Sequence, residues 1–180
     1  MPDIYTNEWY DAVREAMNAS AATLNGVPTG SFVVAVEIVG DGLSPYVEQG
    51  STRHFLVKID AGRCEWYREI ASSEDERRAA GRGVDYRFTG SATAFDEIAC
   101  GVLDPIDAAL RGTVRVRGDM RFLMRHAEHV NALLGAYSRE VDTTWPSGMP
   151  PYGVPSAAAA ASDVVGTDAM MRRDGESIGA

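Results

Sequence analysis

The chain has 180 residues, of which 17 are lysine or arginine and 26 are aspartate or glutamate, so its formal net charge is −9 with histidine neutral. This length corresponds to one domain. An acidic chain without a long basic run does not attract a phosphate backbone, which argues against nucleic-acid binding. The longest uninterrupted apolar stretches, residues 32–36 and 157–161, are far shorter than the roughly 20 residues that a membrane helix needs. These features predict a soluble protein with no stable membrane insertion.

The N-terminus lacks the positive region and the apolar core of a secretory signal, so we expect a cytoplasmic protein. The two cysteines, Cys64 and Cys100, do not have the spacing of a metal knuckle, and a chain of this length can build a core without disulfides. We therefore expect both cysteines to be reduced thiols in the core.

The first half of the chain predicts a helix followed by strands. Apolar residues recur at helical spacing over residues 3–19, and a β-branched run at 32–39 indicates a buried strand. Residues 54–60 and 63–70 predict a hairpin around the turn Asp60-Ala61-Gly62, with Cys64 and Trp66 on its inner face. The charged segment 72–82 predicts an exposed loop or short helix, and residues 84–89 a further strand.

The second half predicts short helices around one more strand. Thr93 and Asp96 have the spacing of a capping box, and Asp104-Pro105 is a stronger start signal for the next helix. Polar and apolar residues alternate over residues 113–117, as in a strand with one face exposed to solvent. Gly118-Asp119 ends this strand and caps a long helix over residues 120–139, which is apolar on more than one side.

The composition changes at residue 142, after which proline, glycine, alanine and serine dominate. We therefore predict a folded domain over residues 1–141 and a flexible tail over residues 142–180.

Motifs for catalysis and cofactor binding are absent. The sequence has no phosphate-binding loop, dinucleotide fingerprint, nucleophile elbow or zinc-protease motif. His126 and His129 lie three residues apart with no third ligand signalled nearby, so we expect no metal site and no cofactor. Large apolar residues are instead in surplus in the short helices, a composition that fits an ordinary core as well as a deformable pocket.

Residues 88–124 carry a recognisable signature. A short helix and Gly101 precede Asp104-Pro105, and the run Gly112-Thr-Val-Arg-Val-Arg-Gly118-Asp119 leads into the final helix. In order and spacing this segment resembles the signature of sterol carrier protein 2 domains. With the helix, strand and hairpin before it, the resemblance covers roughly residues 5–140 and is that of a bacterial-type single-domain member.

The resemblance implies an α/β (α+β) fold with a five-stranded, largely antiparallel sheet that is covered by helices on one face and encloses an apolar tunnel. It also implies non-enzymatic binding and transfer or presentation of a fatty acid, fatty acyl-CoA, sterol or phospholipid. Burying an acyl chain releases about 0.8 kcal/mol per CH₂, so such a site needs apolar walls more than positioned polar groups. The candidate cavity residues are Val13, Met17, Phe55, Val57, Trp66, Phe88, Phe95, Ile98, Val102, Leu103, Leu110, Val114, Val116, Phe122, Leu123, Met124, Val130 and Leu134.

Two other functions stay open at this point. An enzyme could hold a hydrophobic substrate in the same pocket, with His126 or His129 as acid or base, and one of these side chains should then point into the cavity. A protein-interaction domain would instead fill the pocket with its own side chains or with its tail. The tail is also a candidate lid, because Trp145, Met149, Tyr152 and Val154 lie where members of the family often use a C-terminal segment to close the tunnel.

Overall fold

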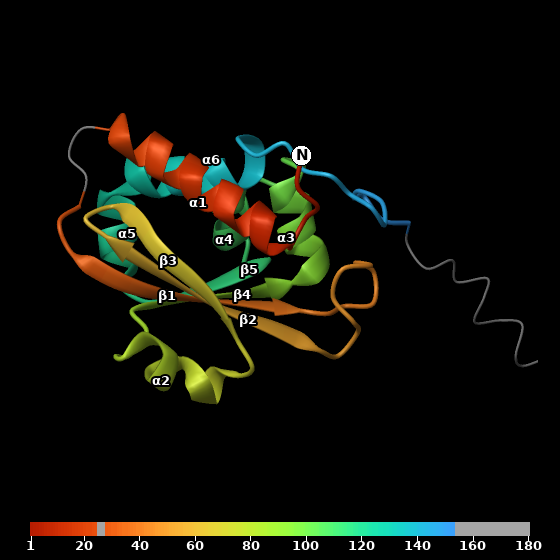
Figure 1. Cartoon of the computed structure of the whole chain (residues 1–180), viewed down its shortest axis with the longest axis horizontal. Helices are drawn as coiled ribbons and strands as arrows, with labels where there is room; N and C mark the ends of the chain where they lie inside the picture. The colour runs from red at the N-terminus through yellow and green to blue at the C-terminus, as the bar shows by residue number, and fades with distance from the viewer. Residues whose placement is uncertain (25–27, 154–180) are drawn as a thin grey trace, which may run out of the picture.

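The computed structural model describes residues 1–24 and 28–153. Five strands form one sheet in the order β3-β2-β1-β4-β5 (Figure 1). The strands are β1 (Ser31–Val39), β2 (Thr52–Asp60), β3 (Arg63–Ile70), β4 (Tyr86–Ser91) and β5 (Val114–Arg117). Only the central β1–β4 pair is parallel, and the β1–β2, β2–β3 and β4–β5 pairs are antiparallel. The predicted five-stranded, largely antiparallel sheet is confirmed, and the parallel pair makes it a mixed sheet.

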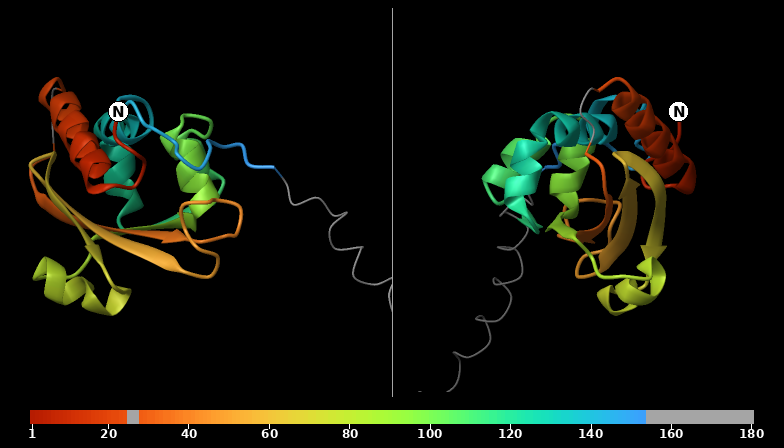
Figure 2. Two further views of the ribbon diagram at one scale, coloured as in Figure 1. Left: turned by 45° about the vertical axis from the view of Figure 1, so that its right-hand side comes forward. Right: turned by 90° about the vertical axis from the view of Figure 1, so that its left-hand side faces the viewer.

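Most helices lie on one side of this sheet (Figures 1 and 2). That layer contains α1 (Asn7–Ala22), α3 (Ala92–Ala99), α4 (Pro105–Leu110), α5 (Met120–Arg125) and α6 (Ala127–Arg139). The short α2 (Glu76–Ala80), which follows a 3₁₀ turn at Ser73–Asp75, lies on the opposite side, where Arg87 of β4 pairs with Glu76 at 2.7 Å. In the part of the chain that the structure describes, no helix is both long enough and apolar enough to cross a bilayer.

Side chains at the helix starts confirm two of the predicted caps. Asp104 accepts hydrogen bonds from the backbone N–H groups of Ile106 and Asp107, at 2.9 and 3.0 Å. Asp119 accepts one from the N–H of Phe122 at 3.1 Å. These carboxylates satisfy amide groups that have no partner inside the helix.

The predicted capping box at Thr93 and Asp96 is wrong. The N-cap of α3 is Ser91, whose hydroxyl accepts a hydrogen bond from the N–H of Ala94 at 3.2 Å. Strand β4 ends at Ser91 and α3 begins at the next residue, so the last strand residue takes the capping position. Asp96 is thereby placed inside the helix, where it is fully buried.

The β2–β3 hairpin forms at the predicted turn, but its second strand changes face. Ala61 and Gly62 both have positive φ, 45° and 75°, as a two-residue hairpin turn of type I′ requires. Lys58 then pairs with Trp66 and Ile59 with Cys64, so Glu65 is an extra residue in β3. Such a bulge reverses which side chains face inward. Cys64 therefore faces the helices, whereas the predicted inward position of Trp66 is wrong.

Trp66 instead packs on the outer face of the sheet. There it covers the small cluster of Val33, Ala35 and Leu56, and the guanidinium carbon of Arg68 lies 4.4 Å from its ring centroid. This outer cluster is covered by residues of the segment that contains α2.

The predicted long helix over residues 120–139 is two helices. The chain breaks at His126, which has φ −109° and ψ 31°. Phe122 of α5 packs on Phe32 of β1 with ring centroids 4.9 Å apart, whereas α6 packs against α1. No proline or glycine lies at the break, so the sequence carries no signal for it, and packing on two different elements decides it.

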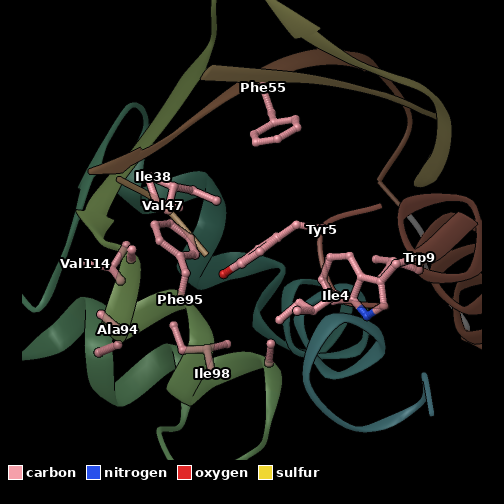
Figure 3. Close-up of a cluster of buried hydrophobic side chains, with 14 residues drawn as sticks. Ile4, Tyr5, Trp9, Ile38, Val47, Phe55, Ala94, Phe95, Ile98 and Val114 are labelled. Carbon is pink, nitrogen blue, oxygen red and sulfur yellow. The ribbon is translucent and has the colours of Figure 1, made fainter. Parts of the chain in front are cut away.

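The main core lies between the sheet and the helical layer. Figure 3 shows Tyr5 projecting from the N-terminal segment between Phe55 of β2 and the α3 residues Phe95 and Ile98. Cys64 and Cys100 are both free thiols; Cys64 is buried, as expected, whereas Cys100 is only half-buried.

Residues beyond 141, the predicted domain boundary, still pack against the domain. The N–H of Ile4 donates a hydrogen bond of 3.0 Å to the carbonyl oxygen of Thr144. The Trp145 ring packs edge-on against Tyr46, with ring centroids 5.8 Å apart. Tyr152 reaches Asp96 of α3. Residues 154–180, which include Val154 and most of the predicted flexible tail, lie outside the described residues.

Candidate functional site

A cavity of about 250 Å³ lies between the sheet and the helical layer. Its sheet wall contains every second residue of β1, because alternate side chains of a strand share one face. Residues Phe32, Val34, Val36 and Ile38 follow this alternation. Phe32 and Ile38 are six residue steps apart, which corresponds to about 20 Å along a strand. The cavity therefore runs lengthwise along β1.

The remaining walls come from β2 and from the helices. Phe32 pairs with Ile59 and Val36 pairs with Phe55, so the inner face of β2 continues the apolar surface of β1. The other apolar contributions come from Val13 and Met17 of α1, Phe95 and Ile98 of α3, Pro105 and Ala109 of α4, Phe122 and Leu123 of α5, and Val130, Leu133 and Leu134 of α6. Nearly all of the lining surface is apolar, as expected for a hydrophobic ligand.

The structure brings most of the candidate residues together on this lining. They are Val13, Met17, Phe55, Val57, Phe88, Phe95, Ile98, Val114, Phe122, Leu123, Val130 and Leu134. Trp66, Val102, Leu103, Leu110, Val116 and Met124 are not part of it.

Local geometry explains why several of these candidate residues do not line the cavity. Val102 is 61% exposed because α3 ends at Ala99 and Gly101, with φ 77°, turns the chain away. Leu110 ends α4 and is 78% exposed, and Met124 is 75% exposed because it lies two residues after Phe122 and so on the opposite side of α5. Leu103 packs against the main core outside the cavity, and Val116 is half-buried on the edge strand β5.

Sequence reasoning missed the β1 residues and the tyrosines of the lining. The signal for β1 was available, since Phe32, Val34, Val36 and Ile38 alternate, but Val33 and Ala35 between them are also apolar. Both faces of β1 are buried, one by the helices and one by the α2 segment, so hydrophobicity does not separate the two faces. Tyr10, Tyr67, Tyr86 and Tyr137 are brought to the cavity by four different elements or segments.

Two histidines lie on the lining near the β2–β3 turn. His129 is only 7% exposed, and burial lowers the pKa of its imidazole, which favours the neutral ring. The backbone of Gly62 is close to it, yet among the described residues neither ring nitrogen has a hydrogen-bond partner. His126 lies one turn earlier and packs on Phe122 with ring centroids 4.5 Å apart.

Two tyrosines of the lining, Tyr10 and Tyr137, carry buried hydroxyl groups. Both rings pack on other aromatic rings: the ring centroids of Tyr10 and Phe55 are 4.8 Å apart, and those of Tyr137 and Trp9 are 5.2 Å apart. Both hydroxyl oxygens are buried; within the described part of the chain the Tyr10 hydroxyl has no hydrogen-bond partner, whereas the Tyr137 hydroxyl lies beside that of Tyr5. Burial raises the pKa of both phenols, so they are un-ionised at neutral pH.

The lining offers little for covalent or metal chemistry. Burial raises the pKa of the Cys64 thiol to about 11, so this side chain is protonated and a poor nucleophile at neutral pH. Within residues 1–24 and 28–153, no group of three histidine, cysteine, aspartate or glutamate side chains is placed to hold a metal ion.

No protein-family model and no curated protein matches the chain. Solved structures do match. The protein TT1886 from Thermus thermophilus, described as possibly a sterol carrier protein, is 19% identical, with a TM-score of 0.57 over 81% of this chain and 94% of that one. A crystal structure of sterol carrier protein 2 is 17% identical, with a TM-score of 0.56 over 78% of this chain and 100% of that one. The resemblance carried by residues 88–124 is confirmed at the level of the fold: this chain has the fold of sterol carrier protein 2.

Proposed function

We propose that the protein binds an elongated hydrophobic ligand in the cavity along β1 and transfers or presents it without covalent chemistry. The observation that carries this proposal is the apolar cavity itself, which lies where close packing would otherwise fill the space between sheet and helices. An unfilled apolar cavity destabilises a fold, so its presence is better explained by an occupant than by stability.

The proposed ligand classes are fatty acids, fatty acyl-CoAs, sterols and phospholipids. The names of the two matching structures refer to sterol carriers, which supports a lipid. Ten buried methylene groups contribute about 8 kcal/mol before the entropic cost of association, enough for useful affinity without any charged contact.

An enzyme that uses His126 or His129 is the second candidate function, because both imidazoles lie on the cavity lining. A general base usually has a partner that orients its ring. Among the described residues, no carboxylate accepts a hydrogen bond from the His129 ring. This arrangement favours binding over acid–base catalysis.

Narrowing the cavity tests the binding proposal. Val34→Phe places a ring on the cavity wall at the middle of β1, and Leu110→Phe makes a comparable change on an exposed residue of α4. We expect V34F to weaken binding of a fatty acid or sterol at least tenfold, by calorimetric titration of delipidated protein, and L110F to bind as the unmodified protein does. The proposal is overturned if the unmodified protein yields no lipid in native mass spectrometry and its melting temperature does not rise with any of the four ligand classes.

The enzymatic candidate is tested with the same ligands. The ligand recovered after prolonged incubation should be chemically unchanged. A converted product that disappears in His126→Ala and His129→Ala variants would establish the enzyme instead.

A further inference from the structure

The outward side of α5 combines apolar and basic side chains. Met120 is 44% exposed and Met124 is 75% exposed, and Arg121 and Arg125 are exposed beside them. Residues four apart lie one above the other on a helix, so the two methionines form one row and the two arginines form the next. The helix therefore presents an apolar and positively charged surface to solvent.

The strand before α5 extends this positive charge. Arg115 and Arg117 are exposed on β5, an edge strand of the sheet. They alternate with Val114, which lines the cavity, so they project from the other face of that edge. Residues 112–127 contain four arginines and a single acidic residue, Asp119, whose carboxylate caps α5. The β5–α5 surface is defined here by the exposed side chains of Arg115, Arg117, Met120, Arg121, Met124 and Arg125.

The arginines of the β5–α5 surface have no acidic partners in the described part of the chain. None of the four has a side-chain nitrogen within 4 Å of a carboxylate oxygen there. By contrast, Arg53 pairs with Glu69 at 2.8 Å and Lys58 pairs with Glu65 at 2.7 Å. A chain with a net charge of −9 has carboxylates in excess, so this local lack of pairing leaves the four guanidinium groups available to an anionic partner.

We propose that the β5–α5 surface docks the protein on an anionic lipid bilayer. The two methionines can enter the boundary of the acyl chains while the guanidinium groups stay among the phosphates. A nucleic-acid backbone would pair with the arginines only and leave both methionines in water. An acidic protein would need a pocket for each methionine of a six-residue helix, whereas a fluid bilayer needs none.

The acidic residues of the protein are placed so that they do not oppose this docking. The exposed side of α1 carries Glu8, Asp11 and Glu15. In the right-hand view of Figure 2, α1 (red) and α5 (blue-green) lie on opposite sides of the helical layer. Salt screens charges that are separated by more than about 8 Å at physiological ionic strength, so the nearest charges dominate at contact. The positive β5–α5 surface can therefore dock although the whole chain is acidic.

The β5–α5 surface is separated from the cavity by a single helix. Phe122 and Leu123, on the inner side of α5, line the cavity. Docking therefore places one wall of the cavity against the bilayer, which is the source or destination of a hydrophobic ligand. This consequence rests on the proposed function, whereas docking itself does not.

Charge reversal tests the basic part of the surface by co-sedimentation with vesicles of phosphatidylcholine, with and without phosphatidylglycerol. Each arginine close to an anionic surface strengthens binding about fivefold, so we expect Arg121→Glu/Arg125→Glu to weaken partitioning onto the anionic vesicles by more than about tenfold. Arg63→Glu/Arg77→Glu is the matched control. It changes the net charge equally, at exposed residues of the opposite edge strand β3 and of α2. We expect a change within about twofold, because screening limits distant charges.

A second pair of variants tests the apolar part. Met120→Ser/Met124→Ser removes the side chains that enter the bilayer, and we expect about tenfold weaker partitioning. Leu43→Ser/Met149→Ser is the control, at residues that are 38% and 58% exposed. They belong to the loop after β1 and the segment after α6, at the end of the molecule far from α5 (Figure 1). This control should partition as the unmodified protein does.

The unmodified protein should sediment with the anionic vesicles and not with phosphatidylcholine alone, and added salt should release it. The inference is overturned if phosphatidylglycerol does not increase binding, or if the control variants lose as much binding as the β5–α5 variants do. Melting temperatures show that the variants are folded, which we expect because all the replaced side chains are exposed.

Titration of each protein with a fatty acid separates this inference from the proposed function. The docking variants should bind the fatty acid as the unmodified protein does, because none of the replaced residues lines the cavity. Vesicle binding by a protein that takes up no lipid ligand would overturn the proposed function and leave docking intact. Ligand binding without vesicle binding would overturn docking and leave the proposed function intact.

Discussion

The hydroxyl of Tyr152 donates a hydrogen bond of 2.8 Å to Oδ2 of Asp96, a carboxylate that is completely buried in α3. Tyr5, near the other end of the chain, donates to Oδ1 of the same carboxylate. One buried acidic side chain thus joins the N-terminal segment, α3 and the segment that follows α6. Phe95, the neighbour of Asp96 in sequence, lines the cavity, so this junction also positions a cavity wall.

The first prediction concerns the contribution of Tyr152 to stability. Tyr152→Phe removes one hydrogen bond to a buried carboxylate, and we expect the free energy of unfolding to fall by about 1–3 kcal/mol in urea denaturation. Tyr46→Phe is the control, since the Tyr46 hydroxyl bonds Gly148 at the exposed surface, and should cost about 0.5 kcal/mol or less. Equal losses in the two variants would contradict a special role for the buried junction.

The second prediction concerns pH. Burial raises the pKa of the Asp96 carboxyl above its ordinary value of about 3.9. The folded state then holds this proton more tightly than the unfolded state, so the contribution of Asp96 to stability is largest below the unfolded pKa and decreases as pH rises through the folded pKa.

Asp96→Asn removes that titration. We expect the free energy of unfolding of the unmodified protein, relative to the D96N variant, to decrease as pH rises from about 4 through the raised pKa. Urea denaturation of both proteins across this range measures the difference, in which the other carboxylates cancel. A difference that increases with pH would show that hydrogen bonds from Tyr5 and Tyr152 outweigh burial.

The third prediction separates a close backbone approach from backbone conformation. A Cβ at Gly40 would overlap the backbone of Glu48, at the point where Gly40 and Gly50 are hydrogen-bonded. We expect Gly40→Ala to lower the free energy of unfolding by about 3 kcal/mol or more, because backbone must move.

Gly81→Ala is the matched control for that variant. Gly81 has φ 72°, but a Cβ there meets no atom within 4 Å. Only the left-handed conformation is penalised, by about 1–2 kcal/mol. Thermal or urea unfolding compares the two variants, and a larger loss at Gly81 would be incompatible with the contact at Gly40.

The fourth prediction concerns thiol reactivity. With a pKa of about 11, only about one in a thousand Cys64 side chains is a thiolate at pH 8, and the thiol is also buried. Cys100 is half-buried, and burial raises its pKa as well. We expect iodoacetamide to label Cys100 first, as read by peptide mass spectrometry.

The effect of a bound lipid on the labelling rates of the two cysteines provides a second measurement. Cys64 lines the cavity and Cys100 does not, so a bound lipid should slow the residual labelling of Cys64 without changing that of Cys100. Faster labelling of Cys64 than of Cys100 in the folded protein would contradict the described burial.

Local signals are sufficient to set some of the helix starts and one turn. Asp104-Pro105 and Asp119 start helices as predicted, because an N-cap side chain bonds to the backbone only two or three residues away. The Ala61-Gly62 turn forms for the same reason, since its geometry depends on its own residues. The order of these signals along residues 88–124 was specific enough to indicate the fold.

The features that sequence reasoning missed depend on distant contacts. Trp66 faces outward because of one bulge residue, the helix breaks at His126 because α5 and α6 pack on different partners, and Asp96 is buried because Tyr5 and Tyr152 meet it there. None of these has a local signal within a few residues.

The amino-acid sequence by itself therefore determined the acidic charge, the strands and the helix starts at Asp104 and Asp119, because these follow from composition, alternation and short-range hydrogen bonds. The order and spacing of the motifs over residues 88–124 indicated the fold of sterol carrier proteins. Only the tertiary structure decided which apolar residues surround a cavity and which form solid core. Hydrophobicity is the same for both, and the difference lies in whether the facing element supplies a side chain to fill the space. It also decided that the Tyr10 hydroxyl is buried without a hydrogen-bond partner among the described residues, since a missing partner is a property of the packed chain and not of any segment.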